Sequence, residues 1–516
     1  MLNARLVHLA FRVLALFSLS VSLVGQSQTA LRSTTALERM PYSGGVLMAR
    51  AIAAGRVAAG PRTLSSLVSP SLSCSPSPCL LPSVQASEGG SPVNETPISV
   101  NAVSPNQLLS GGNDYNCISL QGFFASRDAG SSWSHTCLGV LPGLVGAGDP
   151  IVAWDRNGTA YAGGIDADPS FSNGVIVVAK SSNGGRTFGA PVQAVPNTLG
   201  GLADKPWMEI DNVKSSPFLN RIYVSATQFD ASSNSQISVS HSSDGGTTWT
   251  TANVDTLQTF PSVDQFSDLA VDGDGFVYVT WMRCTANGPA GDCGGTVASM
   301  MFSKSTDGGN SWSSPVVIAQ PNLVPDDCQC AFYGNLPNTT ERVSNIPSVA
   351  VDTFIGRNQS SSPYAVFYNW NGHIMQVQMV HSTDAGNTWD APFNVSPSGT
   401  HDQFFPWVSA DTPIVTVASS GVPVAVTWLD RRNDPSNISY QPFVSFLVTS
   451  TTFAANIPET TVLSNPNDDG FGGLFMGDYT TNAWAGITPR LYHSWMDTRT
   501  GVSQDWVGGM QVLSPR

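Results

Sequence analysis

The chain has 516 residues, of which only 12% are charged, and 37 acidic against 23 basic residues give it a formal charge of −14. This acidity argues against nucleic acid or an anionic membrane as the partner. The 48 glycines and 35 prolines favour strands and turns over surface helices, so the composition predicts an all-β protein.

Residues 1–27 have the pattern of a secretory signal peptide. Arg5 and Arg12 precede an apolar run over residues 13–24, and small and polar residues follow it. The run is shorter than the ~20 residues needed to span a bilayer, which favours a signal peptide over an uncleaved membrane anchor. We therefore expect a secreted protein, extracellular or periplasmic, with no membrane span once the signal is removed.

Residues 28–92 are rich in Ser, Pro and Ala and show no sustained periodicity. We interpret them as a linker or pro-segment that is largely disordered, because they could not bury much apolar surface alone. A short helix over residues 46–59 is the one element that the pattern allows. The folded domain is expected over residues 93–516.

Within that domain an octet of the form S-x-D-x-G-x-x-W occurs five times. Its Asp or Asn can accept hydrogen bonds from nearby backbone N–H groups, its Gly supplies a positive φ, and its aromatic residue buries a large apolar group. Five similar copies indicate a structural turn rather than one active site. The acceptors are Asp128, Asn183, Asp244, Asp307 and Asp384, and the aromatics are Trp133, Phe188, Trp249, Trp312 and Trp389.

A second repeated pattern is an apolar strand ending in Asp, a turn, and a strand ending in an aromatic residue, as in residues 269–281. Each unit then reads as four short antiparallel strands, which is a propeller blade. We count seven units, the last two without the octet. Six blades is the alternative count, if the terminal units merge at the ring closure. We expect the propeller to be a monomer.

The Asp turns also allow a second interpretation. Asp272 and Asp274 resemble the start of a calcium loop, but the later ligands and the bidentate Glu of such loops are missing. A turn with an initiating Asp and a closing Gly is the better interpretation. We therefore predict no cofactor, with Ca²⁺ as a weakly supported alternative.

The eight cysteines fit an oxidising compartment. We expect Cys117 to pair with Cys137, and Cys284 with Cys293. No His lies at ligand spacing from any cysteine, so no metal site is predicted. The last two cysteines are too near each other for a relaxed mutual bond. The pairing of four residues stays open: Cys74, Cys79, Cys328 and Cys330.

The octets and Asp turns lie on one face of such a ring, so the variable loops lie on the other, where binding sites are favoured. Three arginines follow the second strand of their units, with aspartates beside two of them. Together these groups can bind a carboxylated or hydroxylated ligand. The alternative is that each ion pair ties a loop. The residues are Arg283, Arg431 and Arg499 with Asp430 and Asp497.

Further acids come near the start of the first strand of a unit, which would place them around the mouth of the central channel. Among them are Asp149, Asp204 and Asp478, the last next to Tyr479. Glu209 stands apart, because it occupies an innermost-strand position where the other units have small residues. A carboxylate there costs free energy unless it is paired or reaches the channel.

The octets are identified as the Asp boxes, or BNR repeats, of the sialidase superfamily, and residues 94–514 resemble secreted bacterial sialidase-like proteins. In true sialidases three arginines bind the substrate carboxylate, a Tyr and a Glu form the nucleophilic pair, and an Asp is the acid/base. The sequence lacks the family's N-terminal F/Y-R-I-P motif. The resemblance implies Arg283, Arg431 and Arg499 as the arginines, Tyr479 with Glu209 as the pair, and Asp149 or Asp204 as the acid.

The leading hypothesis is a secreted, sialidase-like propeller that binds a glycan or protein ligand on its loop face. Whether it also has glycosidase activity stays open. Two alternatives stay open. One is an active exo-sialidase or other glycoside hydrolase, and the other is a non-catalytic scaffold for protein interactions.

Overall fold

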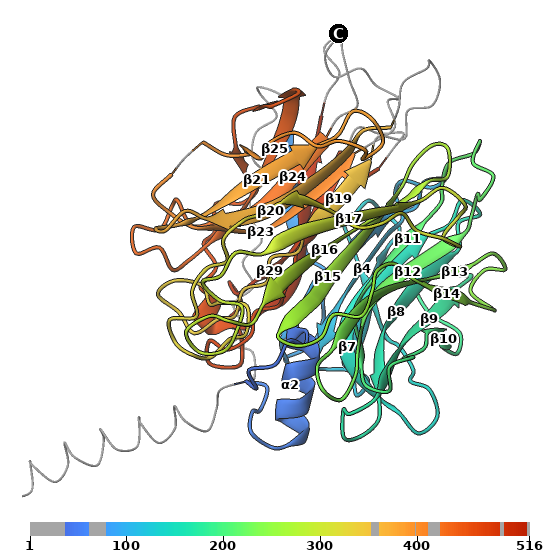
Figure 1. The fold of residues 1–516 in the computed structure, drawn as a ribbon, viewed down its shortest axis with the longest axis horizontal. Helices are drawn as coiled ribbons and strands as arrows, with labels where there is room; N and C mark the ends of the chain where they lie inside the picture. Colours follow the sequence, from blue (N-terminus) through green and yellow to red (C-terminus); the bar gives the residue numbers. More distant parts are fainter. Residues whose placement is uncertain are drawn as a thin grey trace, which may run out of the picture.

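The computed structural model describes residues 37–60, 79–351, 361–397, 399–410, 424–485 and 490–512. The predicted signal peptide lies outside these residues. Seven antiparallel sheets form a seven-bladed β-propeller (Figure 1). This confirms the predicted all-β fold, its four-stranded blades and the count of seven.

The first four blades follow one another along the chain. Blade 1 contains β2 (Val93–Asn94), β3 (Ile98–Val100), β4 (Leu108–Asp114), β5 (Gln121–Ser126) and β6 (Ser134–Cys137). Blade 2 contains β7 (Val145–Trp154), β8 (Ala160–Ala167), β9 (Gly174–Ser181) and β10 (Val192–Val195). Blade 3 contains β11 (Ala203–Ile210), β12 (Ile222–Phe229), β13 (Ser235–Ser242) and β14 (Thr250–Asn253). Blade 4 contains β15 (Ser262–Val271), β16 (Val277–Thr285), β17 (Ser299–Ser305) and β18 (Val316–Ala319).

The remaining blades complete the ring. Blade 5 contains β19 (Ser348–Val351), β20 (Pro363–Trp370), β21 (Met375–His381) and β22 (Phe393–Asn394). Blade 6 contains β23 (Gln403–Ala410), β24 (Val424–Asp430), β25 (Gln441–Thr449), β26 (Thr452–Phe453) and β27 (Ile457–Pro458). The short 3₁₀ helix η1 (Pro466–Asp468) precedes blade 7, which contains β28 (Thr481–Trp484), β29 (Arg490–Asp497) and β30 (Gln504–Gln511).

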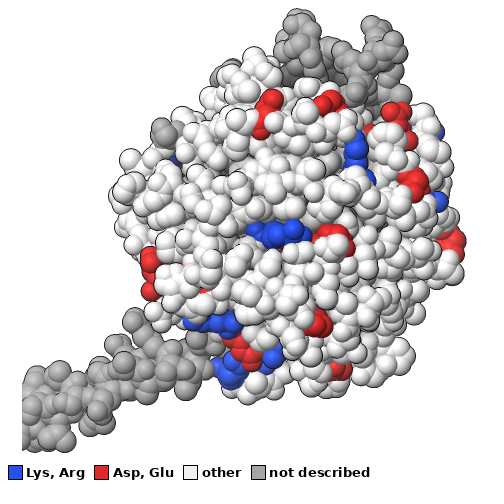
Figure 2. Space-filling view, viewed as in Figure 1, with Lys and Arg blue, Asp and Glu red and all other residues white. Residues whose placement is uncertain are grey.

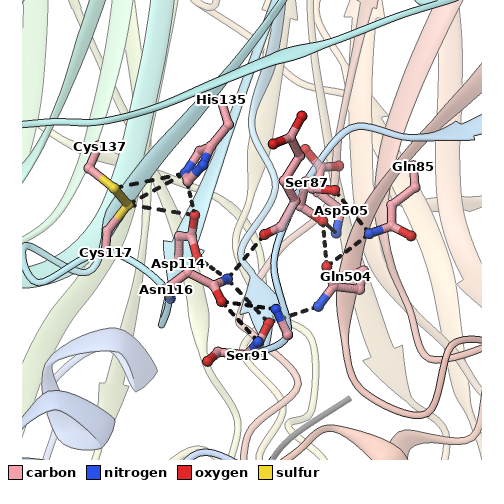
Figure 3. A network of polar contacts seen from close by, with 12 residues as sticks. Gln85, Ser87, Ser91, Asp114, Asn116, Cys117, His135, Cys137, Gln504 and Asp505 are labelled. Atoms are coloured by element: carbon pink, nitrogen blue, oxygen red, sulfur yellow. Dashed lines mark hydrogen bonds and ion pairs between the residues drawn. A yellow bond between two sulfur atoms is a disulfide. The ribbon is translucent and has the colours of Figure 1, made fainter. Parts of the chain in front are cut away.

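A strand from the expected linker closes the ring. β1 (Cys79–Gln85) pairs with β30 and becomes the outermost strand of blade 7, which has only three strands from the C-terminal end. Side chains of Gln85 and Ser87 donate to Oε1 of Gln504 at 3.1 and 2.8 Å (Figure 3). The propeller therefore includes residues from 79 onward, earlier than the boundary at residue 93, because blade 7 needs an outer partner.

The same segment also forms a helix. α2 (Gly44–Ala53) begins at the N-cap Ser43 and is followed by Gly55, which has a φ of 66°. Most of its residues are buried, which fits its nearly all-apolar sequence. It lies on one face of the ring, next to β7 and β15 (Figure 1). Among the described residues no helix is long and apolar enough to cross a membrane.

The five octets form the hairpins between the third and fourth strands of blades 1 to 5. In each, the Gly N–H donates to the Ser hydroxyl at 2.8–3.0 Å. Asp307 accepts from the backbone N and the hydroxyl of Ser311, at 2.9 and 2.6 Å. Asn183 accepts from the backbone N of Thr187 at 3.1 Å, but its side-chain amide donates to the Thr187 hydroxyl, at 2.7 Å. Side-chain acceptors therefore satisfy the backbone of each turn.

Each octet also contacts the preceding blade. The ring centroids of Trp389 and Phe302 are 5.0 Å apart, and those of Phe188 and Phe123 are 5.7 Å apart. A Cβ on Gly386 would lie 2.4 Å from the Phe302 ring. The octets thus lock the hairpins and hold neighbouring blades together.

The disulfides Cys117–Cys137 and Cys284–Cys293 form as predicted. Cys328 and Cys330, whose pairing the sequence left open, are bonded to each other. Their Cα atoms lie 5.2 Å apart, within the normal range, because the intervening Gln329 has a positive φ of 53°. Cys79 is also disulfide-bonded. These disulfides fit an extracellular protein.

Two glycines test the packing of an octet on the preceding blade. Gly386 and Gly372 both have positive φ, but only at Gly386 would a Cβ meet another atom within 4 Å. We expect Gly372→Ala to cost about 1 kcal/mol through backbone strain. Gly386→Ala should cost about 2–4 kcal/mol, because the Phe302 ring must also move. Urea unfolding measures both values, and equal losses would contradict packing between blades 4 and 5.

Candidate functional site

The innermost strands of five blades are interrupted by a non-Gly residue with positive φ. In β7, β11, β15 and β23 this residue coincides with a shift in register against the second strand, and in blade 1 it separates β2 from β3. Such bulges re-aim side chains and are common beside active sites. The residues are Glu95, Asp149, Lys205, Phe266 and Phe405, with φ between 46° and 67°.

Charged side chains from these bulges meet at the mouth of the channel beside α2. The ammonium of Lys205 lies 3.9 Å from the ring centroid of Tyr479, whose hydroxyl donates to the carbonyl oxygen of Pro150 at 2.8 Å. The backbone N of Asp478 donates to Glu95 at 3.2 Å. We call this buried group the mouth cluster, which contains Glu95, Asp149, Asp204, Lys205, Asp478 and Tyr479.

The carboxyl groups of the cluster have different surroundings. Asp204 accepts from the backbone N of Ser43 and from Gln265, each at 2.7 Å, and from the backbone N of Lys205 at 2.9 Å. Within the described ranges, the carboxyl group of Asp149 accepts a single hydrogen bond, from the Ser43 hydroxyl at 3.0 Å. Burial, followed by the charge of Asp204, raises the pKa of Asp149 to about 8. Burial also raises the pKa of Asp204, although its hydrogen bonds from Ser43, Gln265 and Lys205 act in the opposite direction. These bonds favour the ionised form of Asp204, whereas Asp149 is suited to hold a proton at neutral pH.

The separation of these two carboxyl groups is bounded by Ser43, which contacts both of them. Their hydrogen-bonded oxygen atoms cannot lie more than about 9 Å apart, which does not exceed the largest separation, about 9.5 Å, between the two carboxyl groups of glycoside hydrolases.

Several buried atoms of the mouth cluster have unused bonding capacity. The Lys205 ammonium, Oε2 of Glu95 and Oδ2 of Asp149 have no hydrogen-bond partner among the described residues. A buried polar group without a partner costs free energy. The cluster therefore offers a donor and acceptors that its own fold does not satisfy.

The N-terminal segment fills the mouth. Besides the bonds of Ser43, the backbone N of Gly44 donates to Asp478 at 2.8 Å. The carbonyl oxygen of Pro41 accepts from Tyr333 at 2.7 Å and from Gln265 at 3.0 Å. Arg342 contacts both the carbonyl oxygen of Tyr42, at 3.2 Å, and Asp478, at 3.0 Å. Consecutive backbone groups of the segment are thus bound by several blades and by the loop before β19.

Of the residues that the sequence suggests for the site, Asp149, Asp204, Asp478 and Tyr479 lie together in the mouth cluster. Glu209 does not. It lies five residues beyond Asp204 along β11, roughly 15 Å further along the channel wall. Burial raises the pKa of Glu209 to about 8.

The three arginines lie in separate ion pairs. Arg283 contacts Asp264 at 2.7 Å and Asp255 at 2.9 Å. Arg499 contacts Asp497 at 2.5 Å and lies 4.0 Å from the ring centroid of Trp506. These contacts match the alternative in which an ion pair ties a loop.

Arg431 is fully buried and contacts the Pro337 carbonyl oxygen at 2.9 Å and Asp402 at 3.4 Å. Asp430 pairs with Arg432 at 2.5 Å and not with Arg431. The equivalent of Arg499 in blade 6 is therefore Arg432, since each follows the strand-end Trp by four positions.

The sequence analysis missed the roles of Glu95 and Arg342 in this arrangement. A signal for the bulges was present, because Pro follows the bulged residue in Asp149-Pro150, Lys205-Pro206 and Phe405-Pro406. A Pro inside a strand points to a bulge or to an edge without a partner. The proximity of Glu95 and Arg342 to the mouth depends on long-range folding and carries no local signal.

Two groups bear on the metal predictions. His135 Nε2 lies 3.5 Å from the Cys117 sulfur and 3.9 Å from the Cys137 sulfur, a proximity that spacing did not predict (Figure 3). Both sulfurs are used in a disulfide, and a hydrogen bond to Asp114 raises the pKa of His135. The Asp272 carboxylate accepts from the backbone N of Asp274 at 2.9 Å, as the turn interpretation requires.

No family model and no curated protein matches the sequence. Among solved structures, the chain is similar to the α-L-arabinofuranosidase Arb93A from Fusarium graminearum, with 12% identity over 72% of this chain and 93% of that one (TM-score 0.39). It is also similar to the intramolecular trans-sialidase from Ruminococcus gnavus, with 10% identity over 66% and 90% (TM-score 0.42). A third is the Hadza microbial sialidase Hz136, with 14% identity over 66% and 63% (TM-score 0.38). The likeness to these glycosidases concerns the fold.

Glu209 gives a test of burial in the channel. Its pKa of about 8 lies above the value of about 4.3 for an unfolded Glu, so its stabilising contribution is complete below pH ~4 and is lost as the pH rises to about 8. The unfolding free energy of the native protein should therefore fall between pH 5 and 8. For Glu209→Gln we expect this fall to be smaller by about 1–3 kcal/mol. Urea titrations measure this, with the exposed Glu88→Gln as control. Parallel pH curves for Glu209→Gln and the native protein would show that water in the channel solvates Glu209.

Proposed function

We propose that this protein binds a carbohydrate at the mouth cluster and hydrolyses a glycosidic bond there. The observation that carries the proposal is the pairing of two buried carboxyl groups with unequal hydrogen bonding: Asp149 accepts one described hydrogen bond, while Asp204 accepts bonds from Ser43, Gln265 and Lys205 that favour its ionised form. Two carboxyl groups no more than about 9 Å apart, of which one is better stabilised in its ionised form, can supply the general acid and the general base of this reaction.

In this proposal Asp149 gives its proton to the glycosidic oxygen as the bond between that oxygen and the anomeric carbon breaks. Asp204 takes a proton from the water that attacks the anomeric carbon, or attacks that carbon itself before water completes the reaction. Trp207 and Trp407, whose ring centroids are 4.5 Å apart, supply apolar surface beside Tyr479 for a sugar ring.

The charge of the mouth favours an uncharged sugar over a sialic acid. In the part of the chain that the structure describes, the four carboxyl groups of the cluster face two cations, Lys205 and the adjacent Arg342. The arginines that would bind a sialoside carboxylate by the family resemblance are held in separate ion pairs. A carboxylate ligand would therefore meet like charge, whereas hydroxyl groups would meet acceptors. This favours a neutral glycoside over the exo-sialidase alternative.

A panel of fluorogenic pentosides, hexosides and sialosides tests the proposal. The assay needs the full chain and Ser43→Pro in parallel, because the N-terminal segment covers the mouth. We expect turnover of neutral glycosides, and in the Ser43→Pro background Asp149→Asn should lower kcat/KM by about 10²- to 10⁴-fold.

Asp274→Asn, in a turn on the opposite face, serves as the control with unchanged turnover. A protein that turns over only sialosides would contradict the preference for neutral sugars. Glycan binding without any turnover would favour the non-catalytic alternative. Absence of both, in a variant shown by hydrogen exchange to have released α2, would exclude a carbohydrate site at the mouth.

A further inference from the structure

We infer that residues 37–60 are a built-in competitor for the ligand site, so that the protein is held closed until this segment leaves. The inference rests on the proposed function and concerns the regulation of that same site. Its basis is the chemistry of the contacts between the segment and the mouth cluster.

The segment presents donors to the carboxyl groups that would bind a sugar. Asp149 receives a hydroxyl, while Asp204 and Asp478 receive the N–H groups of Ser43 and Gly44. The positive end of the α2 dipole adds to this attraction. A polyol would offer the same kind of donors to the same oxygen atoms. The segment therefore supplies hydrogen-bond donors to the same carboxyl groups that the proposed ligand would bind.

The segment and a ligand cannot occupy the mouth together. Residues 41–45 are buried, and a Cβ on Gly45 would lie 2.2 Å from Oδ1 of Asp149. Similarly, a Cβ on Gly44 would lie 1.9 Å from the Phe475 ring. The two glycines bring the segment's backbone so close to the cluster that no space for a sugar ring remains. Binding of a ligand at Asp149 requires the segment to move away.

The ring does not depend on the segment for its sheets. Within the described part of the chain, residues 37–60 join no β-ladder, and their single backbone-to-backbone hydrogen bond to the propeller is from Gly60 to Gly470, at 2.8 Å. Ring closure is made by β1, which follows the segment. Glu38 pairs with Arg50 and Arg56, all three within the segment and partly exposed. Release of the segment breaks the ion pairs of Arg39 with Asp292 and Asp326 and exposes apolar side chains of α2, but it removes no strand pairing from the blades.

The sharpest test is Ser43→Pro in the full chain. Ser43 has a φ of −59°, which Pro adopts without strain, yet the substitution removes both the N–H bond to Asp204 and the hydroxyl bond to Asp149. We expect hydrogen exchange over residues 44–53 at least tenfold faster and turnover of neutral fluorogenic glycosides at least tenfold higher. Ala53→Ser, at the exposed end of the same helix, should match the native protein in both measurements.

In a second experiment the segment is removed from the protein and added back as a separate peptide. A protease site is inserted directly after Gly60, the protein is cut and washed, and a synthetic peptide of residues 37–60 is added back. We expect the cut protein to keep its melting transition and the peptide to raise KM for the glycoside without changing kcat. A peptide with Ser43→Pro should bind at least tenfold more weakly.

The outcomes separate the two proposals. Equal turnover by the native and the cut, washed protein would overturn the competition, and so would loss of the melting transition when the segment is removed. If α2 opens and the peptide rebinds while no glycan binds or reacts, the proposed function fails and the competition fails with it. Peptide binding, measured without any sugar, shows which of these results applies.

Discussion

The central constraint in this protein is that buried carboxyl groups at the channel mouth need hydrogen-bond donors. Asp149, Asp204 and Asp478 lie where the blades converge and water is excluded. Leaving them without donors would cost free energy, and a fold made of strands has few N–H groups to spare at such a place. The first turn of α2 provides those donors. The one described α-helix is thus joined chemically to the ring.

The position of the acids follows from the architecture of the blades. The octets hold the hairpins on one face and pack each blade on the preceding one, so the innermost strands are fixed in place. Bulges then interrupt these strands and direct Glu95, Asp149 and Lys205 into the mouth. Figure 2 shows a surface that is mostly free of charged side chains. At the mouth, buried charged side chains lie where bulges interrupt the repeated strands.

The sequence was sufficient for the blades, because an octet is local turn chemistry that eight residues carry completely. Strand β1 and helix α2 fell in a segment of low complexity, and their positions depend on partners such as Asp478, 434 residues from Gly44. No local pattern encodes such pairs. The acids of the mouth could be placed near it because they recur at the start of the innermost strands. The proximity of Glu95 to them could not, since it requires the ring to close.

The arginines show how a repeat can suggest a site that the side chains do not build. The strand-end Trp in blades 6 and 7 donates to an Asp two positions on, and that Asp holds an Arg four positions after the Trp. In each of these two blades the Trp, Asp and Arg bind one another, so the guanidinium group has a partner without any ligand. The mouth cluster is different, because Lys205, Glu95 and Asp149 retain atoms that nothing in the described fold satisfies. Arg431 also has guanidinium atoms without a hydrogen-bond partner, so unmet bonding capacity alone does not mark a site. The mouth cluster combines it with several neighbouring buried carboxyl groups, and this combination lies under the N-terminal segment.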